Sequence, residues 1–162
     1  MDAVLENQTC KTKQSTLLGI FAKIFSMIQF NYETNFDLTD EPSYAQWIAN
    51  CAKAYGFQIG ELNYVFCDDA YLLKLNIEFL EHDTFTDIIS FDYTMGKLLS
   101  GDIFISVERV LENAKELSIA PKKEMQRVMI HGVLHCMGYK DKNQAERAIM
   151  RKEEDNCIGL FK

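Results

Sequence analysis

The sequence predicts an α+β domain with a single four-stranded mixed β-sheet and about five helices. Three observations lead to this prediction. The chain has 162 residues, 48% of them hydrophobic, which suits one hydrophobic core. Only two prolines and eight glycines occur, so little sequence is available for a flexible linker. Segments with strand and helix periodicity follow one another in the order β-α-β-α-β-β-α-α-α.

In the first part of the pattern, strands and helices alternate. Pro42 stands where a first helical turn tolerates proline, and Gly56 stands where a helix ends. Asp68 is a good N-cap for the helix that follows the second strand. The predicted elements here are a strand at residues 27–32, a helix at 43–55, a strand at 61–67 and a helix at 69–80.

The second part contains two consecutive strands and three helices. Ser106 caps the first of these helices, Pro121 opens the second, and Gly138 ends it. Asn143, followed three residues later by Glu146, has the pattern of a capping box. The predicted elements are strands at residues 87–93 and 99–105 and helices at 107–117, 121–137 and from the capping box to about residue 156.

The formal net charge of −7 excludes a strongly basic nucleic-acid-binding domain. The charge is unevenly distributed along the chain. Residues 27–94 hold two basic and twelve acidic side chains, whereas residues 95–142 hold eight basic and six acidic ones. This shift predicts two surfaces of different charge, of which the more basic one could bind phosphate groups.

Cysteine usage and the N-terminal segment indicate a cytoplasmic protein. The five cysteines are an odd number without C-x-x-C spacing, which fits a reducing compartment. The apolar run at residues 17–22 is interrupted by Lys23, is too short to span a membrane and precedes no small-residue cleavage site. We expect residues 1–26 to form an N-terminal extension and residues 27–162 to form a single domain.

The strongest chemical signal is a pair of histidines four residues apart. His131 and His135 lie within the predicted helix 121–137, so both imidazoles lie on one face and can reach one metal ion. Asp141 follows the end of this helix, where a turn can return a third ligand. Two histidines and a carboxylate with an open fourth position form a catalytic zinc arrangement. The same spacing also occurs as two partly buried histidines and an ordinary loop aspartate.

The residue after the first histidine argues against a peptidase. In H-E-x-x-H metalloproteases a glutamate at this position is the general base, whereas here the position holds Gly132. No side chain is available there to accept a proton.

Three blocks of sequence resemble the YbeY family of rRNA maturation factors. The run HGVLHCMGYKD at residues 131–141 is similar to the family's metal-binding signature, TDIISF at residues 86–91 to its T-[DN]-[VI]-[LI]-S-F strand, and GDIFIS at residues 101–106 to its G-D-I-x-I-S strand. The resemblance implies a zinc-dependent endoribonuclease specific for single-stranded RNA. It also implies one Zn²⁺ per chain, a role in 16S rRNA 3′ end processing and ribosome quality control, and the small ribosomal subunit, GTPases and ribosomal proteins as partners.

The chain departs from the family pattern at two positions. Asp141 stands where the family has a third histidine ligand, and a carboxylate can replace imidazole on zinc. Leu80 stands where many members carry an arginine thought to act at the reaction centre. The nearest cations in sequence to the metal ligands are Lys140 and Lys142, which we therefore expect to stabilise developing charge.

Two strand residues, Thr86 and Ser90, are candidates for contact with RNA together with Lys140, although strand hydroxyls often serve only as cross-strand partners. Three functions remain open at this stage. The first is the endoribonuclease; the second is a non-catalytic ribosome or RNA-binding assembly factor with a structural metal; the third is another metal-dependent hydrolase.

Overall fold

The computed structural model describes residues 19, 24 and 27–162. It confirms an α+β fold with one four-stranded mixed sheet and five helices in the range 27–162. Apart from residues 19 and 24, the N-terminal extension expected at residues 1–26 lies outside the described residues. No helix in the described part of the chain is long and apolar enough to cross a membrane.

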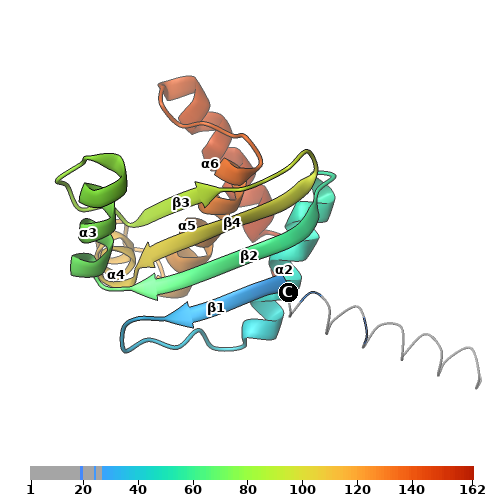
Figure 1. Ribbon diagram of the computed structural model, residues 1–162. Coiled ribbons are helices and arrows are strands. Elements are labelled where there is room, and N and C mark those ends of the chain that lie inside the picture. The colour runs from blue at the N-terminus through green and yellow to red at the C-terminus, as the bar shows by residue number, and fades with distance from the viewer. Residues whose placement is uncertain (1–18, 20–23, 25–26) are drawn as a thin grey trace, which may run out of the picture.

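The order of strands in the sheet is β1-β2-β4-β3 (Figure 1). The pairs β1–β2 and β2–β4 are parallel, and β3 runs antiparallel to β4 at the edge of the sheet. The elements are β1 (Ile28–Tyr32), α2 (Glu41–Ala54), β2 (Gln58–Cys67), α3 (Asp69–Leu80), β3 (Ile88–Asp92), β4 (Leu98–Ser106), α4 (Val107–Glu116), α5 (Pro121–Cys136) and α6 (Gln144–Ile158).

The main core lies between one face of the sheet and the helices behind it in Figure 1. Leu62, Tyr64 and Ile103 of this face are fully buried, and the Tyr64 hydroxyl donates to the backbone oxygen of Met129 in α5 at 3.2 Å. A smaller cluster holds α3 against the opposite face, where Leu72 packs with residues of β3 and β4. Helix α5 therefore contacts the sheet directly, and α6 packs on α5.

Most element starts lie within one residue of the prediction, but those of α2 and β2 differ by two and three residues for local reasons. Helix α2 begins at Glu41 because Asp40, and not a later residue, accepts the hydrogen bond from the backbone N–H of Ser43. Strand β2 begins at Gln58 because pairing with β4 continues through a register shift. Gly60 permits this shift, since a β-carbon there would lie 2.2 Å from the Ser100 hydroxyl oxygen.

Gly132 sets the closest approach of α5 to the sheet. A β-carbon at this position would lie 2.9 Å from Cδ1 of Ile88 in β3 and 3.0 Å from Cγ2 of Ile103 in β4. The absence of a side chain therefore lets the helix backbone lie directly against two strands. His131 and His135 flank this contact, so it places both rings beside edge strand β3.

Replacing Gly132 with valine should separate α5 from the sheet. We expect the free energy of unfolding to fall by about 2 kcal/mol or more, because overpacking a close contact typically costs about 1–3 kcal/mol. Urea unfolding measures this loss. Ala148→Val at an exposed position of α6 is the control for helix propensity, with an expected loss of under about 1 kcal/mol. Equal losses in the two variants would contradict this account of Gly132.

Candidate metal centre

His131 and His135 project from consecutive turns of α5 with their Nε2 atoms facing each other. The two Nε2 atoms are 2.9 Å apart, and the ring planes are nearly perpendicular at 87°. The side chains are 21% and 31% exposed, so the rings lie at the surface of the fold with one side open to solvent.

The end of α5 turns the chain back toward the two rings. Gly138 adopts a φ of 95°, and its N–H donates to the His135 carbonyl while the Tyr139 N–H donates to the Leu134 carbonyl. These bonds form a Schellman motif, whose left-handed position glycine adopts without steric cost. The Tyr139 carbonyl then accepts a 3.0 Å hydrogen bond from His135 Nδ1.

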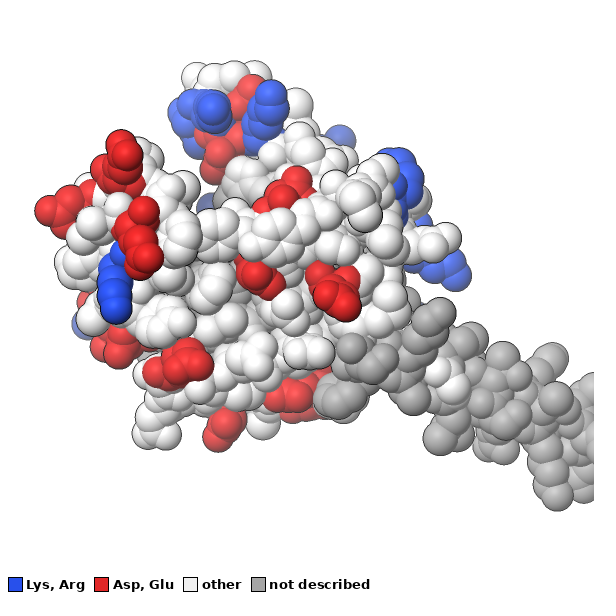
Figure 2. All heavy atoms as spheres, in the orientation of Figure 1, with Lys and Arg blue, Asp and Glu red and all other residues white. Residues whose placement is uncertain are grey.

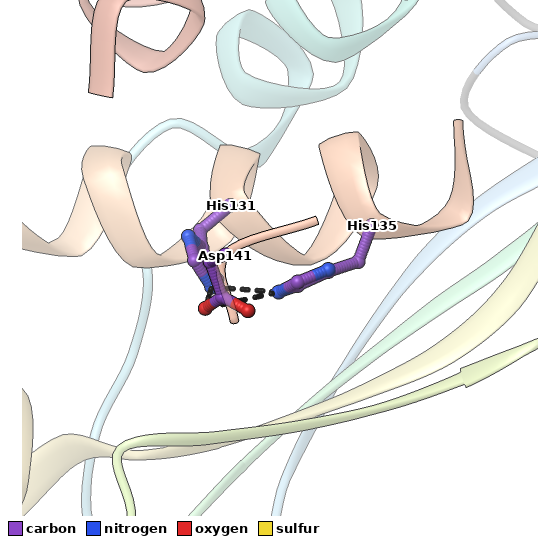
Figure 3. Close-up of side chains that lie close together, drawn as sticks. All are labelled: His131, His135 and Asp141. Atoms are coloured by element: carbon purple, nitrogen blue, oxygen red, sulfur yellow. Dashed lines mark hydrogen bonds and ion pairs between the residues drawn. The ribbon is translucent and has the colours of Figure 1, made fainter. Parts of the chain in front are cut away.

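Asp141 lies in the short segment between α5 and α6 and faces both rings (Figure 3). Its Oδ2 is 3.6 Å from His131 Nε2 and 3.7 Å from His135 Nε2. The predicted capping box of Asn143 and Glu146 is confirmed at the start of α6. The Schellman motif and this capping box fix the segment at both ends.

Glu154 of α6 orients His131. Its Oε1 lies 2.8 Å from His131 Nδ1, and its Oε2 accepts hydrogen bonds from Arg127 Nη1 at 3.0 Å and Arg151 Nη1 at 3.2 Å. The residue is 5% exposed. Burial opposes ionisation, but the hydrogen bonds from His131 and Arg127 hold the pKa of Glu154 below its ordinary value. A buried, ionised carboxylate therefore holds the ring.

The donor set fits a divalent cation. Because the Glu154 carboxylate and the Tyr139 carbonyl are acceptors, we infer that each Nδ1 carries the imidazole proton and each Nε2 presents a lone pair. Two such lone pairs and the Asp141 carboxylate converge, an arrangement that a cation stabilises. Tetrahedral zinc, about 2.1 Å from each ligand atom, would hold these atoms about 3.4 Å apart. The observed distances are 2.9 Å between the two Nε2 atoms and 3.6 and 3.7 Å from them to Asp141 Oδ2, so they lie on either side of that value.

A cavity of about 250 Å³ lies beside the His131–Asp141 contact. Helices α5 and α6 and the start of β3 form its walls. Three of its residues, Arg127, Arg147 and Arg151, are cationic. The full lining is Asp87, Ile88, Glu124, Arg127, Val128, His131, Asp141, Arg147, Met150, Arg151 and Glu154.

The other residues singled out from the sequence lie around this centre rather than in it. Lys140 and Lys142 are exposed in the segment after α5, and neither lines the cavity. Thr86 donates through its hydroxyl to the Ile88 carbonyl at 3.2 Å. Ser90 is half-buried on β3. Leu80, at the position of the family's arginine, ends α3 with 44% of its surface exposed.

Sequence reasoning did not identify Glu154 or the arginines of the cavity. Glu154 is one of several acidic residues in α6, and only its burial distinguishes it from Glu153 and Asp155. Arg147 and Arg151 are four residues apart on α6, which places them on one helical face. The spacing could have indicated a basic face on this helix. Which way that face points, toward α5 or toward solvent, depends on tertiary packing and cannot be inferred from the spacing.

The chain is similar to named bacterial proteins over most of its length. The family model described as endoribonuclease YbeY matches residues 27–162. Proteins named endoribonuclease YbeY are 52% identical in Flavobacterium johnsoniae (83% of this chain, 97% of the relative) and 50% identical in Flavobacterium psychrophilum (83% and 96%). The relative of the same name in Bacteroides thetaiotaomicron is 44% identical (71% and 84%).

The fold also has a counterpart among solved structures. The solution structure of TM1509 from Thermotoga maritima superposes with a TM-score of 0.60 at 24% identity, covering 83% of this chain and 89% of the other. This likeness concerns the fold alone. The family match and the sequence relatives together show that the chain belongs to the endoribonuclease YbeY family.

Proposed function

We propose that this protein is a zinc-dependent endoribonuclease that cleaves single-stranded RNA during rRNA maturation, with His131, His135 and Asp141 as the ligands of one Zn²⁺. Membership of the family whose curated members are named endoribonuclease YbeY supports the reaction. The observation that carries the metal assignment is the convergence of two Nε2 atoms and a carboxylate oxygen within 4.8 Å of one another.

The exposure of the ligands favours a catalytic role over a structural one. Structural zinc sites have four protein ligands and are closed, whereas three protein ligands leave a position for a reactant. Here the three side chains are partly exposed, and two of them, His131 and Asp141, also line the adjoining cavity. Within the described residues, no fourth His, Cys, Asp or Glu joins this group of potential ligands.

A divalent ion at this site would supply Lewis-acid activation of a phosphodiester. The protein's own residues then have separate roles. Glu154 and the Tyr139 carbonyl keep the protons of His131 and His135 on Nδ1 and fix the ring orientations. The arginines beside the site offset negative charge on the substrate. The attacking oxygen comes from water or from the RNA's own 2′-hydroxyl.

We further propose that the protein acts in the cytoplasm on the small ribosomal subunit, in 16S rRNA 3′ end processing and ribosome quality control, with GTPase and ribosomal-protein partners. The resemblance of the three sequence blocks supports these assignments. In this proposal residues 27–162 form the catalytic domain and residues 1–26 form an extension outside it.

Cleavage of RNA by the purified protein tests the proposed reaction. We expect cleavage of a labelled single-stranded RNA to stop on chelation, to return with Zn²⁺, and to fall more than about 100-fold in the double variant His131→Ala, His135→Ala. Gel analysis of the products measures the rate, and metal analysis measures the bound zinc.

His82→Ala is the matched control, because His82 is exposed after α3 and does not line the cavity. Its rate should equal that of the wild type. Unchanged cleavage in the double variant would refute the nuclease site. A zinc-bound protein that cleaves no RNA would favour the assembly factor with a structural metal.

Asp141 should contribute directly to zinc affinity. Asp141→Asn removes the charge of the proposed third ligand, so we expect the zinc dissociation constant to rise by about 100-fold or more. Asp141→His should largely restore affinity, because imidazole is also a zinc ligand. Competition with a chromophoric chelator measures both values. Asp37→Asn, at an exposed position away from the cavity, should change nothing. Wild-type affinity in Asp141→Asn would place the third ligand elsewhere.

Glu154 should stabilise both the site and the fold. In Glu154→Gln the buried guanidinium of Arg127 loses the one buried carboxylate that accepts a hydrogen bond from it, so the metal-free protein should lose about 3–5 kcal/mol in urea unfolding. Zinc affinity should fall about 10–100-fold. The matched control is Asp155→Asn, because Asp155 binds the same guanidinium at 2.9 Å but is 60% exposed. It should lose under about 1 kcal/mol, and comparable losses in both variants would contradict the role assigned to Glu154.

A further inference from the structure

The cavity beside the proposed metal centre combines apolar and charged walls. Ile88, Val128 and Met150 provide apolar surface, and His131 and Asp141 form one edge. A small-molecule site typically has this construction, with apolar walls and a few polar groups that fix orientation. The cavity is thus chemically suited to a flat, partly polar group next to the reacting phosphate.

One side of the cavity carries guanidinium groups with unused donors. Arg147 donates through Nη1 to the carbonyls of Asp141 and Lys142, at 3.2 and 3.1 Å. Arg151 donates through Nη1 to Glu154 at 3.2 Å. Within residues 27–162, these are the hydrogen bonds that the structure gives the two guanidiniums. Their remaining N–H groups suit a phosphate, which arginine binds through paired donors.

The α5 wall carries a carboxylate that lacks a hydrogen-bond partner. Glu124 lines the cavity, is 4% exposed, and its Oε2 is buried without a hydrogen bond to any described residue. Arg127 Nε, which is also buried without a hydrogen-bond partner among the described residues, lies 3.9 Å from this oxygen, within ion-pair distance but beyond hydrogen-bond distance. Arg127 instead donates through Nη1 to Glu154 and through Nη2 to Asp155.

A buried acceptor without a partner is uncommon in folded proteins and costs free energy. Burial also raises the pKa of the Glu124 carboxyl against the opposing charge of Arg127. A ligand that brings N–H donors into the cavity would relieve this cost. The donors of an RNA chain that suit a carboxylate are the ribose 2′-hydroxyl and the amino and imino groups on the edges of the bases, and of these only the base edges can present two donors side by side.

We propose that this cavity is a base-reading nucleotide subsite next to the scissile phosphate, in which Glu124 accepts hydrogen bonds from the base and Arg147 and Arg151 hold a phosphate. The base lies against Ile88 and Met150. This inference rests on the proposed function, because it takes RNA as the substrate. It adds a specificity-determining residue, Glu124, to the residues that bind the metal.

The chemistry of a carboxylate predicts which base is preferred. Guanine presents N1–H and the N2 amino group side by side, which matches the two oxygens of a carboxylate. Adenine and cytosine each present one amino group. Uracil presents a single N–H between two carbonyl oxygens, which a carboxylate repels. The subsite therefore favours guanine most and uracil least.

Cleavage of short RNAs that differ at one nucleotide beside the cleaved bond tests this preference. We expect the wild type to prefer guanine over uracil by about tenfold or more. Glu124→Gln should reduce this difference to under about threefold, because it removes the charge that separates the two bases. Glu116→Gln, at an exposed position of α4, is the matched control and should keep the preference. An equal preference in Glu124→Gln and wild type, or none in the wild type, would overturn the proposal.

Binding of mononucleotides to the metal-free protein separates this inference from the proposed function. We expect guanosine 5′-monophosphate to bind at least about tenfold more tightly than uridine 5′-monophosphate by calorimetry, and Glu124→Gln to abolish the difference. Arg151→Gln should weaken binding of the guanine nucleotide but leave guanosine unaffected. Such binding without any RNA cleavage would retain the subsite and refute the nuclease. Cleavage with no difference between the two nucleotides would retain the nuclease and refute the subsite.

If Glu124 serves only as a structural neighbour of Arg127, its substitution should change stability and not base preference. Urea unfolding of Glu124→Gln accompanies the binding measurements for this reason. A loss of stability with the base preference intact would overturn the proposal. If Glu124→Gln fails to fold, Arg151→Gln still tests the proposal. An equal loss of affinity for guanosine 5′-monophosphate and for guanosine in this variant would exclude the phosphate contact and overturn the proposed subsite.

Discussion

The buried carboxylate of Glu154 is the interaction on which the proposed site depends. It lies on α6 but accepts hydrogen bonds from His131 and Arg127 of α5, and from Arg151 one turn away. A carboxylate removed from water needs several charged or polar partners to remain ionised. Because those partners include a proposed metal ligand and a residue of the cavity wall, the packing of α6 on α5 and the orientation of the imidazole cannot vary independently.

Two glycines of the α5 region place the site relative to the sheet. Gly132 lets the helix backbone approach Ile88 and Ile103, which brings the flanking histidines to the edge of the sheet. Gly138 takes the left-handed conformation that reverses the chain after the helix. The reversal explains how Asp141, six residues beyond His135, comes to face the same point in space as the two rings.

Sequence reasoning was most successful where the determinants are local. Caps such as Ser106 and Asn143 bond to backbone groups three residues away, so their function can be inferred from the sequence. The histidine spacing and the turn at Gly138 likewise indicated the three residues that converge. Glu154 escaped prediction because it contacts His131 across 23 positions, and its role follows from helix packing rather than from a local pattern. For the same reason proximity in sequence suggested Lys140 and Lys142, whereas the cavity is lined by arginines of α5 and α6.

The distribution of charge explains how an acidic protein can present a site for RNA. Most charged side chains on the open face of the sheet and on α3 are acidic, whereas basic side chains gather over α6, among acidic ones, and at the right edge of the view (Figure 2). A polyanion is therefore repelled from the broad sheet face and attracted toward the side where α6 borders the proposed metal centre. Contact with only a few phosphates suffices for binding there, and affinity then depends on salt through those few contacts rather than through the net charge of −7. Local arrangement of arginine side chains, and not overall composition, is thus the electrostatic property that bears on the proposed reaction.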